Sequence, residues 1–573
     1  MGFTQYHRRR ESLQPERRHN EPGNLHYLHT IMTKYHSRKQ ANPVDAIFPT
    51  CRKLVGPKRW VALYNEQTAV NEGIDAAGFV NAMESLADKA MIPDYLHEVA
   101  VIEHLLHQIT SSAVHINAST AGAGEWQLNP SLQVLNTEWN SAEAIHNLNG
   151  DNSFWPTEKP GHTLVWYDAR QQKARVKAAD HEELFCLKSC AEGLTTQQAS
   201  DAVDKHPDAI HNALCRTRDQ GLIVGGIPKL RRADSFCTSP VPDDFRTVRK
   251  FVLQWHITHA CDLHCKHCYD RSRRSTMSLE QGINILNQFG EFCREKNVGG
   301  HVCFSGGNPL MSPHFFELYE RAANRGHDLS ILGNPCAHIE LDRIQRIKRP
   351  EYYQVSLEGL PEHNNQIRGK GFFGRVIEFL GRLRDTEISS GVMLTLTRDN
   401  IDQVLPLAER LRGHADSFTF NRLSPVGEGA DLAMPSQKDF RAFLAEYHAA
   451  AKENPILAIK DNLFNIVCRE NGLPPFDGCT GFGCGAAFNF VALLPDGEVH
   501  ACRKFPSLIG NMFREDLLTI YDSPEAQKYR TRPDECHDCE LCPTCGGCLA
   551  ITSGMGGDFS ADKDPFCWRT SES

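Results

Sequence analysis

The sequence lacks a long apolar run, an export signal and an excess of basic residues. None of its 573 residues belongs to a run near the ~18 apolar residues of a membrane-spanning helix, so we expect no membrane association. The arginines near the N-terminus precede no apolar segment, which argues against a secretory or twin-arginine signal. The formal net charge is −9, so no general nucleic-acid-binding field is expected. These absences favour a cytoplasmic protein without a nucleic-acid partner.

The composition is that of a globular protein with several domains, since 40% of the residues are hydrophobic and 23% charged. Residues 1–45 predict a basic, disordered tail, and Met32 is an alternative start. Apolar residues recur at three- and four-residue spacing in 77–90 and 95–109, so residues 46–155 are predicted to form a helical accessory domain.

Cysteine is abundant and unevenly placed. Nine of the 21 cysteines lie between Cys479 and Cys567, and three more lie within eight residues at Cys261, Cys265 and Cys268. Without an export signal, such clusters indicate metal or redox chemistry more than a disulfide framework.

Residues 156–245 predict a small winged-helix-like unit. A hairpin over 163–167 and 174–178 precedes three helices and a strand at 221–224. The third helix, within 207–220, carries as many acidic as basic residues, which disfavours DNA binding. An iron–sulfur regulator that binds DNA through this unit stays open as an alternative.

Residues 246–465 alternate strands and helices. Six βα units of this kind predict an α/β fold with a parallel sheet curled into a partial (β/α)6 barrel, with its chemistry at the C-terminal ends of the strands. The cysteines of the first cluster follow the first strand directly. The predicted strands are 250–257, 300–304, 328–332, 353–357, 392–396 and 417–420, and the clearest helices are 279–296 and 374–384.

The spacing C-x3-C-x2-C of Cys261, Cys265 and Cys268 suits two kinds of metal site. Three thiolates on one loop can hold three irons of a [4Fe–4S] cluster and leave the fourth iron open. The alternative is a zinc site completed by a neighbouring histidine, namely His259, His264 or His267.

This spacing after a first strand, with Tyr269 after the last cysteine, resembles the radical S-adenosylmethionine (SAM) superfamily. The resemblance implies that SAM chelates the open iron and is cleaved to a 5′-deoxyadenosyl radical that abstracts hydrogen from the substrate. It further implies an electron donor such as ferredoxin or flavodoxin. The implied SAM-binding positions are Tyr269, the SGGNP motif (Ser305, Gly306, Gly307, Asn308, Pro309), Ser356, Glu358 and Arg368, with Asn308 in place of the usual glutamate.

The C-terminal cysteines of residues 466–573 resemble the SPASM domain of radical SAM enzymes, which implies two auxiliary [4Fe–4S] clusters and three clusters in all. A hairpin is predicted around 493–499, and the extra Cys542 leaves one ligand open. A pair of zinc ribbons is the alternative. The implied ligands are Cys479, Cys484, Cys502 and Cys548 for the first cluster and Cys536, Cys539, Cys545 and Cys567 for the second.

The substrate class follows from resemblance alone. The 156–245 unit resembles PqqD-type recognition elements, in which a leader peptide adds as a strand to the hairpin edge. Residues 251–274 and 47–60 resemble the selenobiotic-peptide maturases of the SbtM type. We therefore expect a ribosomally made, cysteine- or selenocysteine-containing precursor peptide as partner, modified by thioether crosslinking or oxidation. An anaerobic sulfatase maturase is the alternative, although Arg503 stands where that family has an aspartate base.

Overall fold

The computed structural model describes residues 43–569, apart from residues 57, 59, 61–74, 89–91, 113–125, 148–154, 234–235, 241–242 and 273. Residues 1–42, which hold most of the tail expected to be disordered, lie outside this part. The described chain forms two compact units, which we describe separately: residues 196–215 with 227–569, and residues 43–195 with 216–226.

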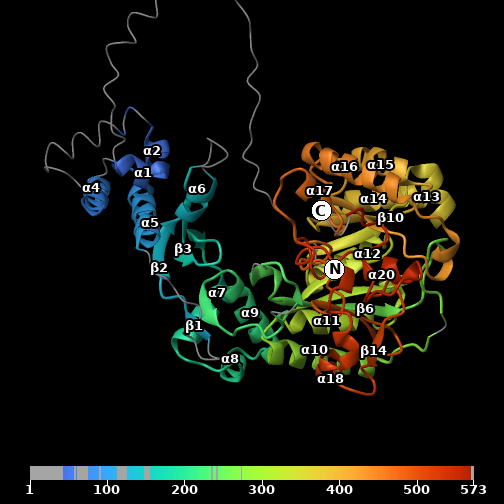
Figure 1. The fold of residues 1–573 in the computed structure, drawn as a ribbon. Helices are drawn as coiled ribbons and strands as arrows, with labels where there is room; N and C mark the ends of the chain where they lie inside the picture. The colour runs from blue at the N-terminus through green and yellow to red at the C-terminus, as the bar shows by residue number, and fades with distance from the viewer. Residues whose placement is uncertain are drawn as a thin grey trace, which may run out of the picture. The chain divides into compact units, whose positions relative to one another are not determined.

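A nine-stranded sheet runs through the larger unit (Figure 1). Its order is β11-β10-β9-β8-β7-β6-β12-β13-β14, and the strands from β11 to β12 are parallel. The six strands predicted for the barrel are confirmed. Their bounds are β6 Lys250–Thr258, β7 Gly299–Gly306, β8 Asp328–Leu332, β9 Tyr352–Ser356, β10 Ser390–Leu396 and β11 Ser417–Arg422.

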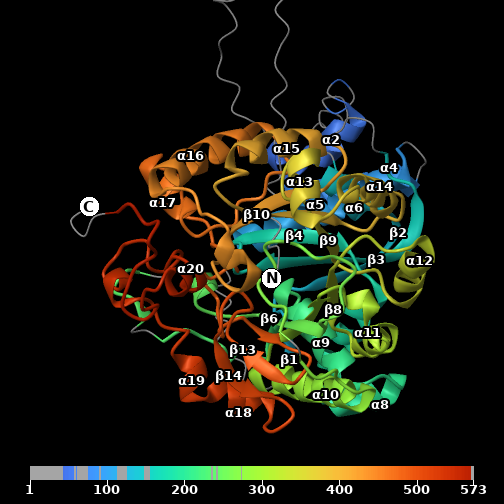
Figure 2. The same cartoon turned by 90° about the vertical axis from the view of Figure 1, so that its right-hand side faces the viewer.

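Helices follow these strands and lie along the outer side of the curved sheet (Figure 2). The predicted helix at 279–296 begins at a capping box in which Ser278 and Gln281 satisfy each other's backbone N–H groups. The helices are α10 Leu279–Lys296, α11 Phe315–Asn324, α12 His338–Ile347, α13 Pro361–Arg368, α14 Phe372–Asp385, α15 Val404–Leu411, α16 Gln437–Glu453 and α17 Phe464–Glu470.

The strand β12 (Phe490–Leu493) belongs to the barrel sheet as well as to the cysteine-rich region. It pairs in parallel with β6, with Phe490 opposite Val252, and antiparallel with β13 (Glu498–His500). The predicted hairpin around 493–499 is thus confirmed, but its attachment to the barrel was not predicted. The rest of this region holds β14 Leu508–Asn511, α18 Leu517–Asp522, α19 Pro524–Gln527 and α20 Leu549–Gly554.

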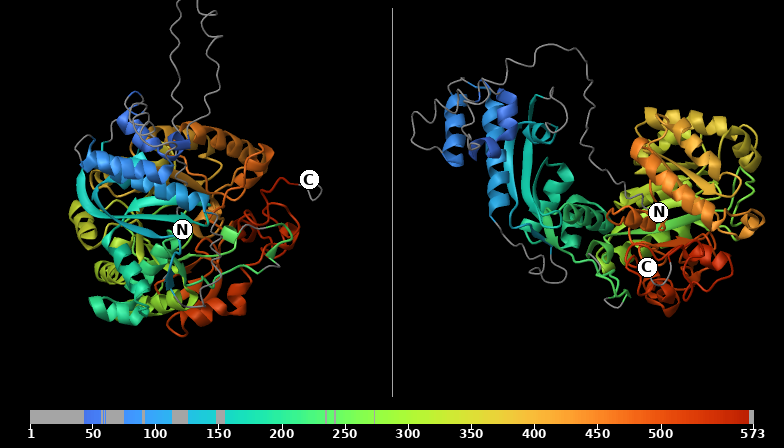
Figure 3. Two further views of the ribbon diagram at one scale, coloured as in Figure 1. Left: turned by 90° about the vertical axis from the view of Figure 1, so that its left-hand side faces the viewer. Right: turned by 45° about the horizontal axis from the view of Figure 1, so that its top comes forward.

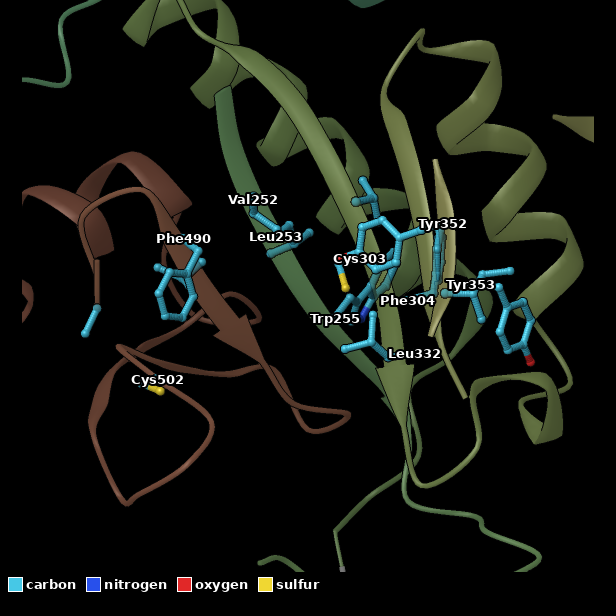
Figure 4. Packing of buried hydrophobic residues seen from close by; sticks show 14 of the residues in the cluster. Val252, Leu253, Trp255, Cys303, Phe304, Leu332, Tyr352, Tyr353, Phe490 and Cys502 are labelled. Carbon is cyan, nitrogen blue, oxygen red and sulfur yellow. The ribbon is translucent and has the colours of Figure 1, made fainter. Parts of the chain in front are cut away.

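One continuous hydrophobic core joins the barrel and the cysteine-rich region. Figure 4 shows Trp255 and Phe304 side by side, with ring centroids 5.7 Å apart, and Phe304 packs against Phe315 of α11 on the helix-covered face of the sheet. Phe490 of β12 lies beside Val252 in the same view. Because the core is shared, the two regions fold as one body rather than as separable domains.

The smaller unit carries a three-stranded antiparallel sheet in the order β2-β3-β4 (Figure 3). The predicted hairpin is confirmed as β3 and β4, but the strand β2 lies within residues 46–155, where only helices were expected. The strands are β2 Gln133–Trp139, β3 Glu158–Asp168 and β4 Lys173–Ala178. A separate antiparallel pair joins β1 Trp126–Leu128 to β5 Ile223–Gly225.

Helix α5 contacts all three strands of this sheet. The predicted helices at 77–90 and 95–109 are confirmed as α4 and α5, and the first of the three helices predicted after the hairpin is α7. No helix of the described chain is long and apolar enough to cross a bilayer. The helices here are α1 Pro43–Ile47, α2 Pro49–Val55, α4 Ala76–Asp88, α5 Asp94–Ser111, α6 Ser141–Asn147 and α7 His181–Ala191. The helix α8 Thr196–Val203 belongs to the larger unit, and α9 Pro207–Asp219 runs from one unit into the other.

Candidate active site

The first cysteine cluster lies on the loop that follows β6, at the C-terminal rim of the parallel strands. Two glycines at the end of β7 let that strand approach the loop. A Cβ at Gly306, whose φ is +148°, would lie 2.3 Å from the Thr258 carbonyl oxygen, and one at Gly307 would lie 2.4 Å from that of Ala260. Larger residues would push the loop away, so the glycines fix its position.

The rim loop borders a cavity of about 560 Å³, lined by Cys261, Cys265 and Cys268. Most of the predicted SAM-binding residues line the same cavity, whereas Asn308, Pro309 and Glu358 do not. The predicted residues that line it are Tyr269, Ser305, Gly306, Gly307, Ser356 and Arg368.

Two side chains donate hydrogen bonds to cysteine sulfurs of the rim loop. Arg368 Nη1 lies 3.7 Å from Cys265 Sγ, and Asn334 Nδ2 lies 3.7 Å from Cys261 Sγ. Burial raises the pKa of the Cys265 thiol, and the charge of Arg368 acts in the opposite direction. Donors of this kind stabilise thiolates, the form that binds metal.

Glu358 is buried and holds Arg368 in place. Its Oε1 accepts from Arg368 Nε at 2.9 Å, and its Oε2 accepts from the Thr395 backbone N–H at 2.8 Å. Burial alone would raise the pKa of Glu358, but His267 and Arg368 lower it below its usual value. In this arrangement Glu358 positions Arg368 instead of facing the cavity.

Asn308 replaces the expected glutamate and contacts the loop through a carboxylate. Its Nδ2 lies 3.1 Å from Asp262 Oδ1, and Asn334 Nδ2 lies 2.6 Å from the same oxygen. Its backbone N–H donates to the Ala260 carbonyl at 2.8 Å. Asn308 therefore ties β7 to the rim loop, and sequence reasoning missed both Asn334 and Asp262.

Four C-terminal cysteines line a second, enclosed cavity of about 50 Å³. Burial is the main cause that raises the pKa of Cys502 to about 12, and the nearby thiols of Cys548 and Cys484 act in the same direction. The pKa of Cys479 is raised by burial and also by the nearby thiol of Cys484. These are the four cysteines grouped by the sequence, namely Cys479, Cys484, Cys502 and Cys548.

The second predicted set is also gathered in space. Burial is the main cause that raises the pKa of Cys536 to about 12, and the neighbouring thiols of Cys567 and Cys539 act in the same direction. Burial and the thiols of Cys567 and Cys536 likewise raise the pKa of Cys545. The extra Cys542 is buried against Cys237, a residue that the sequence did not single out. In the described ranges, no three His, Cys, Asp or Glu side chains are placed to hold a single metal ion.

Three cations lie at the boundary of the two cavities. Arg422 and Lys504 line both cavities, and Arg503 lines only the larger one. Arg422 is buried and paired with Asp461 and Asp564 at 2.7 Å each. Arg503 Nη1 lies 3.4 Å from Ser305 Oγ, and its guanidinium lies 5.6 Å from the Tyr269 ring centre. Only Arg503 was noted from the sequence, as a departure from a pattern.

Comparison with known proteins matches both halves of this site. Residues 255–411 match the radical SAM superfamily, and residues 484–548 match the SPASM iron–sulfur cluster-binding domain. An AdoMet-dependent heme synthase of Methanosarcina barkeri is 25% identical over 55% of this chain and 95% of its own. The subtilosin biosynthesis protein AlbA of Bacillus subtilis is 26% identical over 56% of this chain and 71% of its own.

Solved structures are similar at lower identity. The Streptococcus suis protein SuiB bound to precursor peptide SuiA is 16% identical, covers 71% of this chain and 97% of its own, and gives a TM-score of 0.46. The two domain matches coincide with the two cysteine-lined regions. The radical SAM match contains the rim loop, and the SPASM match contains the hairpin of β12 and β13. The chain is a radical SAM enzyme with a SPASM domain.

Proposed function

We propose that this enzyme modifies a ribosomally made precursor peptide. The observation that carries the proposal is a groove of about 460 Å³ along β4, the edge strand of the smaller unit's sheet. Within the described chain, β4 pairs only with β3. An open edge beside a groove is the geometry that accepts an added peptide strand.

The groove offers side-chain recognition beside the backbone edge. Arg175, Val176 and Lys177 of β4 line one side, and Asp219 and Gln220 line another. Alternate residues of a strand point to opposite faces, so an added strand would meet these side chains at every second position. Mixed charges along the groove suit a leader of defined sequence better than a general polyanion.

We propose that the rim cysteines hold the SAM-cleaving [4Fe–4S] cluster. The two four-cysteine sets would hold two auxiliary clusters, which makes three. When bound, SAM and the rim cluster supply hydrogen-atom abstraction by a 5′-deoxyadenosyl radical. The chain's own residues hold the cysteine loop: Arg368 and Asn334 donate to its sulfurs, and Glu358 fixes Arg368.

The number of thiols in the first auxiliary set favours an electron-transfer role there. Four cysteines line this cavity, one for each iron of a [4Fe–4S] cluster, so no iron is left open for a substrate thiol. We therefore propose that a cluster held by these four cysteines would supply an electron acceptor for the substrate radical. A change of its EPR signal on adding a cysteinyl peptide, of the kind that direct ligation produces, would contradict this role.

An acidic one-electron carrier such as flavodoxin or ferredoxin is the proposed donor. A second groove, of about 410 Å³, lies on the other side of the rim loop and contains Lys266, Lys370 and Arg375. Both lysines are exposed. Basic side chains next to the rim cluster would steer an acidic carrier toward it.

A small-molecule substrate is the second candidate, because relatives of similar identity include AdoMet-dependent heme synthases. The sulfatase-maturase alternative is disfavoured because Arg503, a cation, lines the cavity where that family has an aspartate. The DNA-regulator alternative is disfavoured because Glu143 and Asp168 lie beside the basic residues of the edge groove.

Capture by the full-length protein tests the proposal. The immobilised chain is offered short peptides encoded beside its gene, with iron-coproporphyrin III, duplex DNA and a folded sulfatase as competitors. We expect one cysteine-rich peptide to be retained and then modified under anaerobic conditions. Of two consecutive residues on an edge strand, one has its backbone N–H directed away from the partner strand, and proline removes that N–H. We therefore expect that one of the two variants Arg175→Pro and Val176→Pro, the one that removes the outward N–H, no longer retains the peptide. Retention of the porphyrin, the DNA or the sulfatase instead would reject the peptide assignment.

A further inference from the structure

The larger cavity is lined by a cation, Arg503, that no carboxylate of the described residues neutralises. No Asp or Glu in this part of the chain lies within ion-pair distance of Arg503, and its Nε is buried without a hydrogen-bond partner. The other three cavity arginines are paired: Arg271 with Glu428, Arg368 with Glu358 and Arg422 with two aspartates. A guanidinium without a carboxylate partner keeps N–H donors available for a ligand.

The neighbouring lysines lie at the cysteine-lined SPASM cavity, whereas Arg503 does not. Lys460 lines that cavity and Lys504 lines both cavities, but Arg503 lines only the larger one. The guanidinium of Arg503 therefore faces the cavity that the rim cysteines border.

The position of Arg503 selects the kind of ligand that it can bind. Its guanidinium lies beside Ser305 and the Tyr269 ring, both on the lining of the cavity in which we propose that SAM and substrate meet. A planar fork of donors matches the two oxygens of a carboxylate, and a partly buried site strengthens that pairing.

We propose that Arg503 binds a carboxylate of the substrate and so selects the atom presented to the radical. This inference rests on the proposed function, and it narrows the substrate to one with a carboxylate near the reacting carbon. The carboxylate can come from the C-terminus of the peptide or from an Asp or Glu side chain. Arg503 is then a binding and specificity residue.

Small matched probes test this without knowledge of the peptide. The full-length protein, loaded with iron, sulfide and SAM, is titrated calorimetrically with N-acetylalanine and with N-acetylalaninamide, which differ only in the carboxylate. We expect the acid to bind about tenfold more tightly, a difference of about 1.4 kcal/mol. Arg503→Met should abolish the preference and Arg503→Lys should retain part of it. Arg398→Met, which removes an exposed arginine, should retain all of it.

Several results would overturn the inference. Equal binding of acid and amide by the unmodified protein would do so, as would a preference that survives Arg503→Met. If Arg503→Met lost SAM affinity in parallel with its preference for the acid, Arg503 would bind the carboxylate of SAM instead. A comparison of N-acetylglycine with N-acetylaspartic acid α-amide, whose side-chain carboxylate is free, separates the two sources. Failure of peptide capture with an intact acid preference would reject only the peptide assignment.

Discussion

The rim loop and the enclosed SPASM cavity hold their cysteines in opposite ways. The rim thiols come from one short loop, are exposed or half-buried, and face a cavity of about 560 Å³. The first SPASM set comes from two loop segments and a helix start, and lines a cavity of about 50 Å³. An open site suits ligand exchange, whereas a closed one suits electron transfer without ligand exchange.

The charges around the two sites differ as well. The rim loop has one buried arginine, whose charge is balanced by Glu358. The SPASM cavity has Lys460 and Lys504 beside its thiols, and burial lowers the pKa of Lys460 to about 8. Four thiolates carry more negative charge than three, so the closed site needs more cations nearby.

Loss of a rim cysteine should give the largest effect. Cys265→Ala removes one of three thiolates, and reductive SAM cleavage to 5′-deoxyadenosine should fall by at least about 10³-fold, because the bound cofactors carry the chemistry. Chromatography of the nucleoside products measures it. Cys190→Ala, in the smaller unit, should cleave SAM normally. Undiminished SAM cleavage by the Cys265→Ala variant would show that the rim loop is not needed for that reaction.

Loss of a SPASM cysteine should separate the two sites. Cys548→Ala should lower the iron content by about four atoms per chain and abolish peptide modification, while SAM cleavage continues at a reduced rate. Iron analysis and product mass spectrometry are read on the same sample. If SAM cleavage is lost as completely as in Cys265→Ala, the two sites do not work independently.

Accessibility should distinguish the clusters without any mutation. With the three clusters proposed above, mild oxidation with a chelator should first remove about four of about twelve irons, and SAM cleavage with them. The reason is that Cys261 of the rim loop is exposed, whereas the eight SPASM cysteines are half-buried or buried. Mössbauer spectra taken during removal would follow this. Simultaneous loss of all three clusters would mean that enclosure of the SPASM cavity gives no protection.

A single lysine should give the smallest effect. Lys504→Met removes a positive charge beside Cys502 and Cys548, so the reduction potential of the first auxiliary cluster should become more negative by some tens of millivolts. The rim cluster should change less. Redox titration followed by EPR measures both, and Arg398→Met controls for net charge. A larger shift at the rim cluster would contradict the division of charges described above.

Local patterns predicted much of this molecule. Buried parallel strands read as continuous apolar runs, so β6 to β11 could be located, and the glycines after β7 marked the rim. Family resemblance grouped the eight SPASM cysteines into the two sets that the structure gathers. Grouping on spacing alone was impossible, because partners such as Cys502 and Cys548 are far apart in sequence.

The unpredicted features depend on long-range pairing. β12 has only four residues, and nothing in FVAL indicates that its partner is β6. The strand β2 was missed because its burial pattern is mostly exposed, with one buried residue, Thr137. Asn334 contacts the rim loop through side-chain hydrogen bonds to Cys261 and Asp262, for which no sequence pattern exists.

The pairing of β6 with β12 also constrains the order in which the chain can fold. Until residues 490–493 have been synthesised, the first barrel strand has an unpaired edge, and a nascent chain must keep that edge from other partners. High contact order of this kind slows folding. A shortened chain that ends after β11 should therefore aggregate, so the SPASM region cannot be removed or exchanged as a cassette.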